Sequence, residues 1–191
     1  ALLGTKPPPR QRVTELSGAT VSASCPGLRR RLVLLTSSSA QPLPTRDLLE
    51  EAIRLLALGA TEHFEDGVET SFSHALMRFS VRYGWPAIDA LVAAMSSGLV
   101  SAEVISEACR WMGRVEDPST HDHRRWLLEW CLFHPSILVR DGALLGLAAL
   151  DDPCAVRSLL MCLHKERYES FREDIQQVVD QLESTERCRG S

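Results

Sequence analysis

The stretch SILVRDGALLGLAALDDPCAVRSLLMCLHK, residues 136 to 165, decides the fold of this chain. It holds two apolar segments on either side of the corner Asp151-Asp152-Pro153. The first segment has a helical stripe of Leu138, Ala143, Leu144, Leu147 and Leu150, and the second has one of Val156, Leu159, Leu160 and Leu163. Neither helix can bury its apolar stripe alone, so each needs neighbours on both sides. The stretch therefore predicts stacked helices.

The corner recurs along the chain. Glu116-Asp117-Pro118 lies 35 residues before Asp151-Asp152-Pro153, and Trp85-Pro86 lies 32 residues before Pro118. Proline in the first helical turn loses no hydrogen bond, and an aspartate just before it can accept from the free N–H groups. A small residue precedes each proline by ten or eleven positions: Ala75, Ala108 and Ala143. A period of this length, made of two helices, is typical of a helical solenoid.

The repeated motif resembles the HEAT-repeat family. The resemblance is carried by Val139-Arg140-x-x-Ala143-x-x-x-Leu147 and by Asp152-Pro153-x-Ala155-Val156-x-x-Leu159-Leu160. It implies an all-α, right-handed α-solenoid of about four HEAT-like helical hairpins. Members of that family mostly bind proteins along a concave face made by the second helix of each hairpin, and a few are DNA glycosylases or tetrapyrrole lyases. The alternative fold is a helical bundle in which the prolines recur by chance.

The chain is predicted to have three parts. Residues 1–44 hold six of the ten prolines and form an irregular or flexible Pro/Ser-rich segment, with a weak hairpin near 13–23 and a β-like run at 32–36. Residues 45–186 form the HEAT-like helical repeat domain, and 187–191 a disordered tail. The expected helices are 45–58, 68–82, 86–96, 101–113 and 120–133, the two within 136–165, and 170–184. Gly59 is expected to stop the first, and Ser170 with Glu173 to cap the last.

Composition and charge exclude several classes of protein. The chain has 191 residues, 45% hydrophobic and 24% charged, with a net charge of −4. Only two lysines are present, Lys6 and Lys165, so we expect no nucleic-acid partner. No apolar run reaches the length of a membrane span, so we expect no membrane partner.

The six cysteines include no C-x-x-C pair. Four of them, Cys109, Cys131, Cys154 and Cys162, fall in predicted helices, where a free cysteine behaves as a small buried apolar residue. Residues 1–35 also lack the order of a signal peptide. We therefore expect a reducing, cytoplasmic environment.

The segment His121-Asp122-His123-Arg124-Arg125-Trp126-Leu127-Leu128-Glu129-Trp130 carries the most unusual surface. Trp126 and Trp130 are one helical turn apart, as are Arg125 and Glu129, which can form an ion pair. Tryptophan and arginine are frequent hot spots of protein interfaces, so a docking patch is one interpretation. The others are that both tryptophans are core, or that they and Glu129 line a catalytic pocket.

A metal site would need His121, His123, Cys131 and His134 to converge. Nearly three helical turns separate the two pairs, so one ion cannot use both. No nucleophile elbow, phosphate loop or H-E-x-x-H motif is present. We expect no cofactor, no metal and no enzymatic activity.

The sequence thus predicts a non-catalytic protein-binding module, a scaffold such as an adaptor or an inhibitor or immunity-type protein. The expected partner-binding residues lie on the second helices of the hairpins: Asp89, Arg125, Trp126, Glu129, Arg157, Met161 and His164. Two alternatives remain open, a HEAT-like enzyme such as a DNA glycosylase or tetrapyrrole lyase, and a structural end-piece of a larger repeat assembly.

Overall fold

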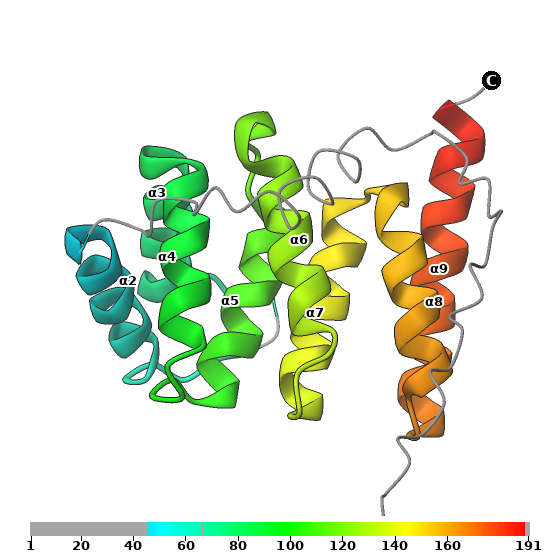
Figure 1. The fold of residues 1–191 in the computed structure, drawn as a ribbon, viewed down its shortest axis with the longest axis horizontal. Coiled ribbons are helices and arrows are strands. Elements are labelled where there is room, and N and C mark those ends of the chain that lie inside the picture. Colours follow the sequence, from blue (N-terminus) through cyan, green and yellow to red (C-terminus); the bar gives the residue numbers. More distant parts are fainter. Residues whose placement is uncertain (1–45, 66, 190–191) are drawn as a thin grey trace, which may run out of the picture. The chain divides into compact units, whose positions relative to one another are not determined.

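The structure is a computed structural model that describes residues 46–65 and 67–189, with side chains up to residue 186. The predicted hairpin near 13–23 and the β-like run at 32–36 lie outside the described residues. Every regular element in the described part is helical, which confirms the all-α class (Figure 1).

The α-helices lie close to their predicted places. They are α2 (Arg46–Gly59), α3 (Ser71–Tyr83), α4 (Trp85–Met95), α5 (Ala102–Arg114), α6 (His121–Cys131), α7 (Ile137–Leu150), α8 (Val156–Lys165) and α9 (Glu169–Arg189). Short 3-10 turns, η1 (Pro118–Thr120) and η2 (Pro153–Ala155), lead into α6 and α8. The last helix differs most from the prediction, because α9 continues to Arg189, well past Ser184.

The helices pack in two rows. In one row α3 packs on α5, α5 on α7, and α7 on α9, while in the other α2 packs on α4 and α4 on α6. The rows meet through α3 with α4, α5 with α6, α6 with α7, and α8 with α9 (Figure 1). Each interior helix therefore covers an apolar stripe with neighbours from its own row and from the other.

The three recurring prolines occupy equivalent corners. Pro86 lies in the first turn of α4, Pro118 opens η1 before α6, and Pro153 opens η2 before α8. At the last two corners the preceding aspartate accepts a hydrogen bond from the backbone N–H two residues later: Asp117 from Ser119 and Asp152 from Cys154, both at 2.9 Å. The Asp-Pro motif acts here as the start signal that its sequence predicts.

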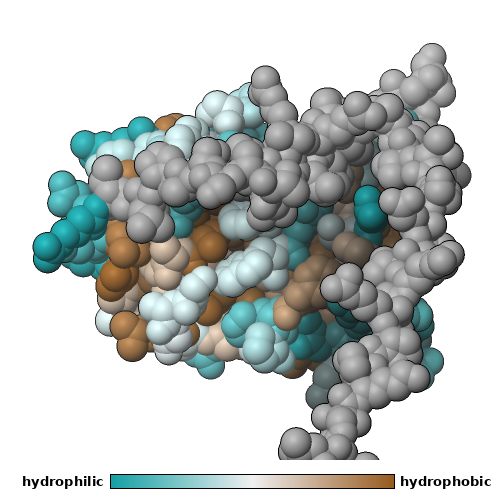
Figure 2. Space-filling view, in the orientation of Figure 1, coloured by the Kyte–Doolittle hydropathy of each residue, from teal (hydrophilic) through white to brown (hydrophobic). Residues whose placement is uncertain are grey.

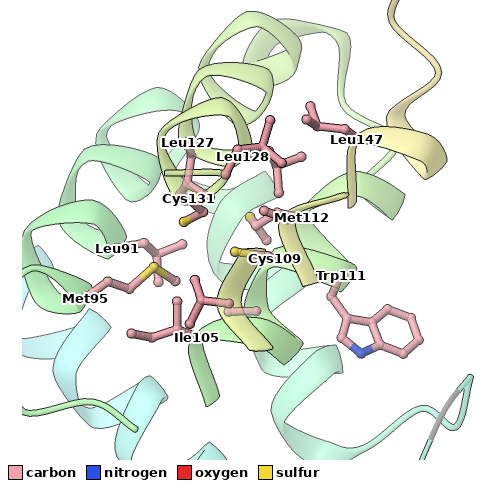
Figure 3. Packing of buried hydrophobic residues seen from close by; sticks show 14 of the residues in the cluster. Leu91, Met95, Ile105, Cys109, Trp111, Met112, Leu127, Leu128, Cys131 and Leu147 are labelled. Atoms are coloured by element: carbon pink, nitrogen blue, oxygen red, sulfur yellow. The ribbon is translucent and has the colours of Figure 1, made fainter. Parts of the chain in front are cut away.

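The centre of the core lies where α4, α5, α6 and α7 meet. Figure 3 shows Leu91, Ile105, Met112, Leu127 and Leu147 from these helices gathered around one another. Cys109 and Cys131 are also buried there and carry free thiols, as expected. A hydrogen bond with Cys131, together with burial, raises the pKa of Cys109 well above its usual value. Cys109 is therefore a packing residue with little thiolate character, and Cys131 is buried beside it.

The expectation of free cysteines fails at Cys154. This residue lies in η2 and is disulfide-bonded, and its partner is outside the side chains that the structure describes. Cys162 is free and buried, with its thiol 3.5 Å from the carbonyl oxygen of Leu132.

The closest approach of two helices is between α5 and α7. A Cβ added at Gly113 would lie 2.7 Å from the Cα of Gly146, and one at Gly142 would lie 2.7 Å from the Cα of Ser106. Real side chains do not come so near to backbone, so these positions accept only glycine at the present spacing. Ala108 and Ala143, the small residues of the repeated motif, are buried as well, but the glycines set the spacing of α5 and α7.

None of the helices in the described part of the chain is both long enough and apolar enough to cross a membrane.

Candidate functional site

Aromatic and acidic side chains lie along α4 and α6, some of them exposed and some half-buried. We call this surface the aromatic face, and it consists of Trp85, Asp89, Asp122, Trp126, Glu129, Trp130 and Phe133. The first turns of the two helices are side by side, because the ring of Trp85 stacks on that of His123 with centroids 6.0 Å apart. Since α4 also packs along α6, their exposed stripes form one surface. Figure 2 shows hydrophobic residues open on the face of the helical unit in view.

The exposure of the aromatic side chains is high for residues of this size. Trp85 is 42% exposed, Trp130 37% and Phe133 45%. Trp126 is half-buried and packs against the hydrophobic core. The two tryptophans of α6 therefore divide between the interpretations that the sequence left open: Trp126 supports the core, whereas Trp130 belongs to the surface.

Arg125 lies beneath this surface rather than on it. Its side chain is only 7% exposed, and its Nε is 2.9 Å from Oδ2 of Asp152, in the turn before α8. Its Nη2 is 3.3 Å from Asp122, and its Nη1 is 3.8 Å from Glu129, the partner that the sequence predicts. The guanidinium of Arg125, which the sequence predicts as a partner-binding group, is therefore covered by carboxylates and not open to solvent.

The same aspartate connects α6 to the start of α8 a second time. Nε2 of His121 lies 3.1 Å from Oδ2 of Asp152, the oxygen that Arg125 contacts. Because Asp152 also caps η2, one carboxylate fixes the start of α8 against the start of α6. The turn that orients α8 is thereby held by ionic contacts.

The remaining predicted residues lie on exposed stripes. Asp89 is half-buried on α4, one turn after Trp85, while Arg157, Met161 and His164 are exposed along one side of α8. Leu160, on the same stripe, is exposed as well. The structure thus places Asp89 on α4 and Trp126 and Glu129 on the neighbouring α6, while the three α8 residues lie on a separate helix whose start is joined to α6 through Asp152.

Three further exposed residues are not among those predicted from the sequence: Trp85, Phe133 and Leu160. In the sequence Trp85 stands next to a helix-opening proline, and a tryptophan there lies at a helix end, where exposure is common. Phe133 follows Trp130 by three positions and Leu160 follows Arg157 by three, so both share a helical stripe with residues already selected. That spacing was the available signal.

The described residues contain no group of three or more His, Cys, Asp or Glu side chains able to hold a metal ion. Of the residues considered for such a site, His121 is engaged with Asp152, His123 stacks on Trp85, and Cys131 is fully buried. Packing and ion pairing therefore account for the positions of these three side chains.

No protein-family model matches the chain, and no curated protein or solved structure matches it either.

Proposed function

We propose that this chain is a non-catalytic protein-binding module, of the adaptor, inhibitor or immunity type, that holds a partner on the exposed sides of α4, α6 and α8. We further propose that its helices form a right-handed HEAT-like array. Support for the array comes from the equivalent corners at Pro86, Pro118 and Pro153 and from the order of the helices in the two rows.

The observation that carries the proposal is the exposure of large rigid side chains on a well-supported surface. Trp85, Trp130 and Phe133 present aromatic area that a partner can cover at little cost in side-chain entropy. The backbone beneath them is fixed, because α6 is packed against α4, α5 and α7 and its Arg125 is held by carboxylates. A surface of this kind is preorganised for binding.

The test is capture of proteins from the cells that produce this chain, comparing the wild type with two matched variants. Trp130→Glu alters the aromatic face, whereas Leu145→Glu alters an exposed apolar residue of α7, in the other row, which is 44% exposed. We expect partners held by the wild type and by Leu145→Glu to be lost with Trp130→Glu. The affinity of these partners for Trp130→Glu should be at least about tenfold lower than for the wild type, while the melting temperature of the variant stays unchanged.

Equal capture by all three proteins, with all three folded, would contradict the proposal. Loss of capture together with a lower melting temperature of Trp130→Glu would also count against it, because it would assign Trp130 to the core. The milder variant Phe133→Ala changes a residue just after the end of α6 and then decides the question. If Phe133→Ala captures partners as well as the wild type does, the aromatic face is not the binding surface.

A further inference from the structure

Cys154 is the one disulfide-bonded cysteine among those whose side chains the structure describes. Cys109, Cys131 and Cys162 carry free thiols, so only Cys25 and Cys188 remain as its partner in a chain of six cysteines. The bonded cysteine is also the more open one. It is half-buried in η2, whereas the free cysteines are no more than 3% exposed.

The end of α9 lies against the turn that contains Cys154. Thr185 donates a hydrogen bond from its hydroxyl to Oδ1 of Asp151 at 3.0 Å, and Gln181, one turn earlier, donates to the carbonyl oxygen of Ala148 at 2.9 Å. The helix also packs against η2 and α8 (Figure 1). The contacts therefore advance along α9 as the chain advances from the end of α7 towards η2.

The same progression leads from Cys154 to Cys188. Residue 188 follows Thr185 by three positions, so it lies on the same side of α9, and Cys154 follows Asp151 by three positions. Continuing the pattern by one turn brings the backbone of residue 188 to η2, as a disulfide with Cys154 requires. The register of the two segments therefore favours Cys188 as the partner.

Packing of apolar residues does not account for the length of α9. Its buried apolar stripe ends at Leu182, and the residues from Glu183 to Arg189 are polar apart from Cys188. A polar helix end at the end of a chain usually frays. The helix nevertheless continues to Arg189, and a covalent link at residue 188 would hold this end in place.

We propose that Cys154 and Cys188 form a redox-sensitive clamp, a disulfide that fastens the last turns of α9 to the turn before α8. A dithiol reductant opens the clamp. One of its thiolates attacks a sulfur of the bond and its second thiol then displaces that sulfur, so the reductant becomes a disulfide and its two hydrogens end on the two cysteines.

The surroundings of the cysteines make this exchange selective. The half-buried position of Cys154 leaves the bond within reach of a small reductant. Burial raises the pKa of Cys162, and the hydrogen bond with Cys131 raises that of Cys109. Thiols with little thiolate character attack a disulfide slowly, so these two compete poorly for the bond.

Opening the clamp should release α9 and leave α8 in place. The start of α8 is fixed to α6 by Asp152, through Arg125 and His121, and these ionic contacts do not depend on the disulfide. The start of α9 is held separately, since Glu166 accepts from the backbone there. Reduction should therefore loosen only the last turns of α9.

Peptide mapping of the full chain, isolated without reductant, identifies the partner. Free thiols are alkylated, and trypsin then places Cys154 in the fragment 141–157, Cys188 in 188–189 and Cys25 in 13–29. We expect the fragment 141–157 to be linked to 188–189. A link to 13–29, a link between two copies of the chain, or an alkylated Cys154 would each overturn the assignment.

Hydrogen exchange measures what the clamp holds. Dithiothreitol should speed amide exchange in residues 183–189 at least about tenfold and lower the melting temperature by about 5–10 °C, while α8 keeps its protection. Without reductant, Cys188→Ser should exchange like the reduced wild type. The matched variant Cys25→Ser should exchange like the oxidised wild type.

Two exchange results would contradict the clamp. If the bond is open by mass and residues 183–189 keep their protection, the end of α9 holds by itself. If the loss of protection extends through α8, the disulfide supports the whole corner and does not act on α9 alone. Neither result bears on the proposed function, because the inference does not depend on partner binding.

Discussion

Arg124 and Arg125 are adjacent in sequence and both buried, yet they have opposite surroundings. Arg125 is surrounded by carboxylates, whereas Arg124 donates to oxygens without charge: to the carbonyls of Met112 and Asp117, at 2.9 and 3.1 Å, and to the hydroxyl of Thr120 at 3.2 Å. Burial lowers the pKa of the Arg124 guanidinium from its ordinary value. The side chain ties the end of α5 and the turn η1 to α6.

Replacement of Arg124 by lysine should destabilise the protein by about 2–3 kcal/mol, although the charge is kept. A lysine ammonium cannot reach three acceptors in different directions, so at least one buried carbonyl would lose its donor. Unfolding in urea measures the change. The control is Arg54→Lys, at an exposed position of α2, which should stay within about 0.5 kcal/mol of the wild type. Equal stability of the two variants would show that Arg124 only fills space.

The sequence distinguishes some residues at this scale and not others. The caps Asp117 and Asp152 could be predicted, because each depends only on the proline and the N–H groups that follow it. The pKa of Asp117 lies below its usual value, chiefly because the Ser119 hydroxyl and backbone N–H donate to it. The different roles of Arg124 and Arg125 could not be predicted, because they depend on oxygens brought in by α5 and η2.

At the scale of the helix, α2 and α7 end in different ways. Gly59 was expected to end α2 with a left-handed conformation, but it is the last helical residue, and a Cβ there would lie 3.0 Å from Val104 and 3.1 Å from Phe72. Its small size serves packing. The left-handed conformation appears instead at Asp151, with φ of 51°, which ends α7. An aspartate tolerates this conformation better than most side chains.

Gly146→Ala should lower the free energy of unfolding by about 2 kcal/mol. On an exposed helix the same change would stabilise by about 1 kcal/mol through helix propensity. Here the new Cβ would meet the carbonyl oxygen of Cys109 and lie 2.7 Å from Cδ2 of Leu128, so α5 and α7 must separate. Thermal unfolding measures the effect, and an unchanged or higher melting temperature would mean that the two helices yield without cost.

The start of α9 shows where local sequence misleads. Ser170 and Glu173 have the spacing of a capping box, but the helix already begins at Glu169, so Ser170 lies inside it. The N–H groups near the helix start are met by the carboxylate of Glu166, which accepts from Arg167 at 2.8 Å and from Tyr168 at 3.1 Å. Glu166 is held in place by Arg140 of α7, a partner that no local pattern reveals.

At the scale of the whole helical unit, the ion pair between Arg140 and Glu166 connects the last two helices, α8 and α9, to α7. Nη2 of Arg140 lies 2.9 Å from Oε2 of Glu166, whose side chain is 5% exposed, and the guanidinium also lies over the ring of Phe171. Burial alone would raise the pKa of Glu166, but the N–H groups of Tyr168 and Arg167 and the Arg140 guanidinium outweigh it. The pKa therefore lies below the ordinary value of 4.5.

A carboxyl with a lowered pKa stabilises the folded state above its unfolded pKa and loses this contribution as the pH falls through the folded value. Glu166→Gln should therefore be less stable than the wild type by about 3 kcal/mol at neutral pH. The difference should shrink once the pH drops below 4.5. Urea unfolding across this pH range measures it, with Glu173→Gln as the exposed control. A difference that stays constant at all pH values would show that Glu166 acts through shape alone.

The all-helical class is the part of the whole that could be predicted furthest, because it follows from the apolar periodicity and from the helix-start signals at Pro86, Pro118 and Pro153. Which tryptophan of α6 is exposed could not be predicted. Trp126 and Trp130 share a stripe, and only the tertiary packing buries the first more than the second.

The glycines at the α5–α7 approach have a consequence for tracing the descent of this chain. Apolar core positions can exchange leucine, isoleucine and methionine during evolution, so the residues at these positions say little about common descent. At Gly113, Gly142 and Gly146 any side chain would collide with the opposite backbone, so this geometry leaves no substitute. A distant homologue with the same helix spacing should keep these three glycines at the same intervals, even where the rest of its sequence has diverged.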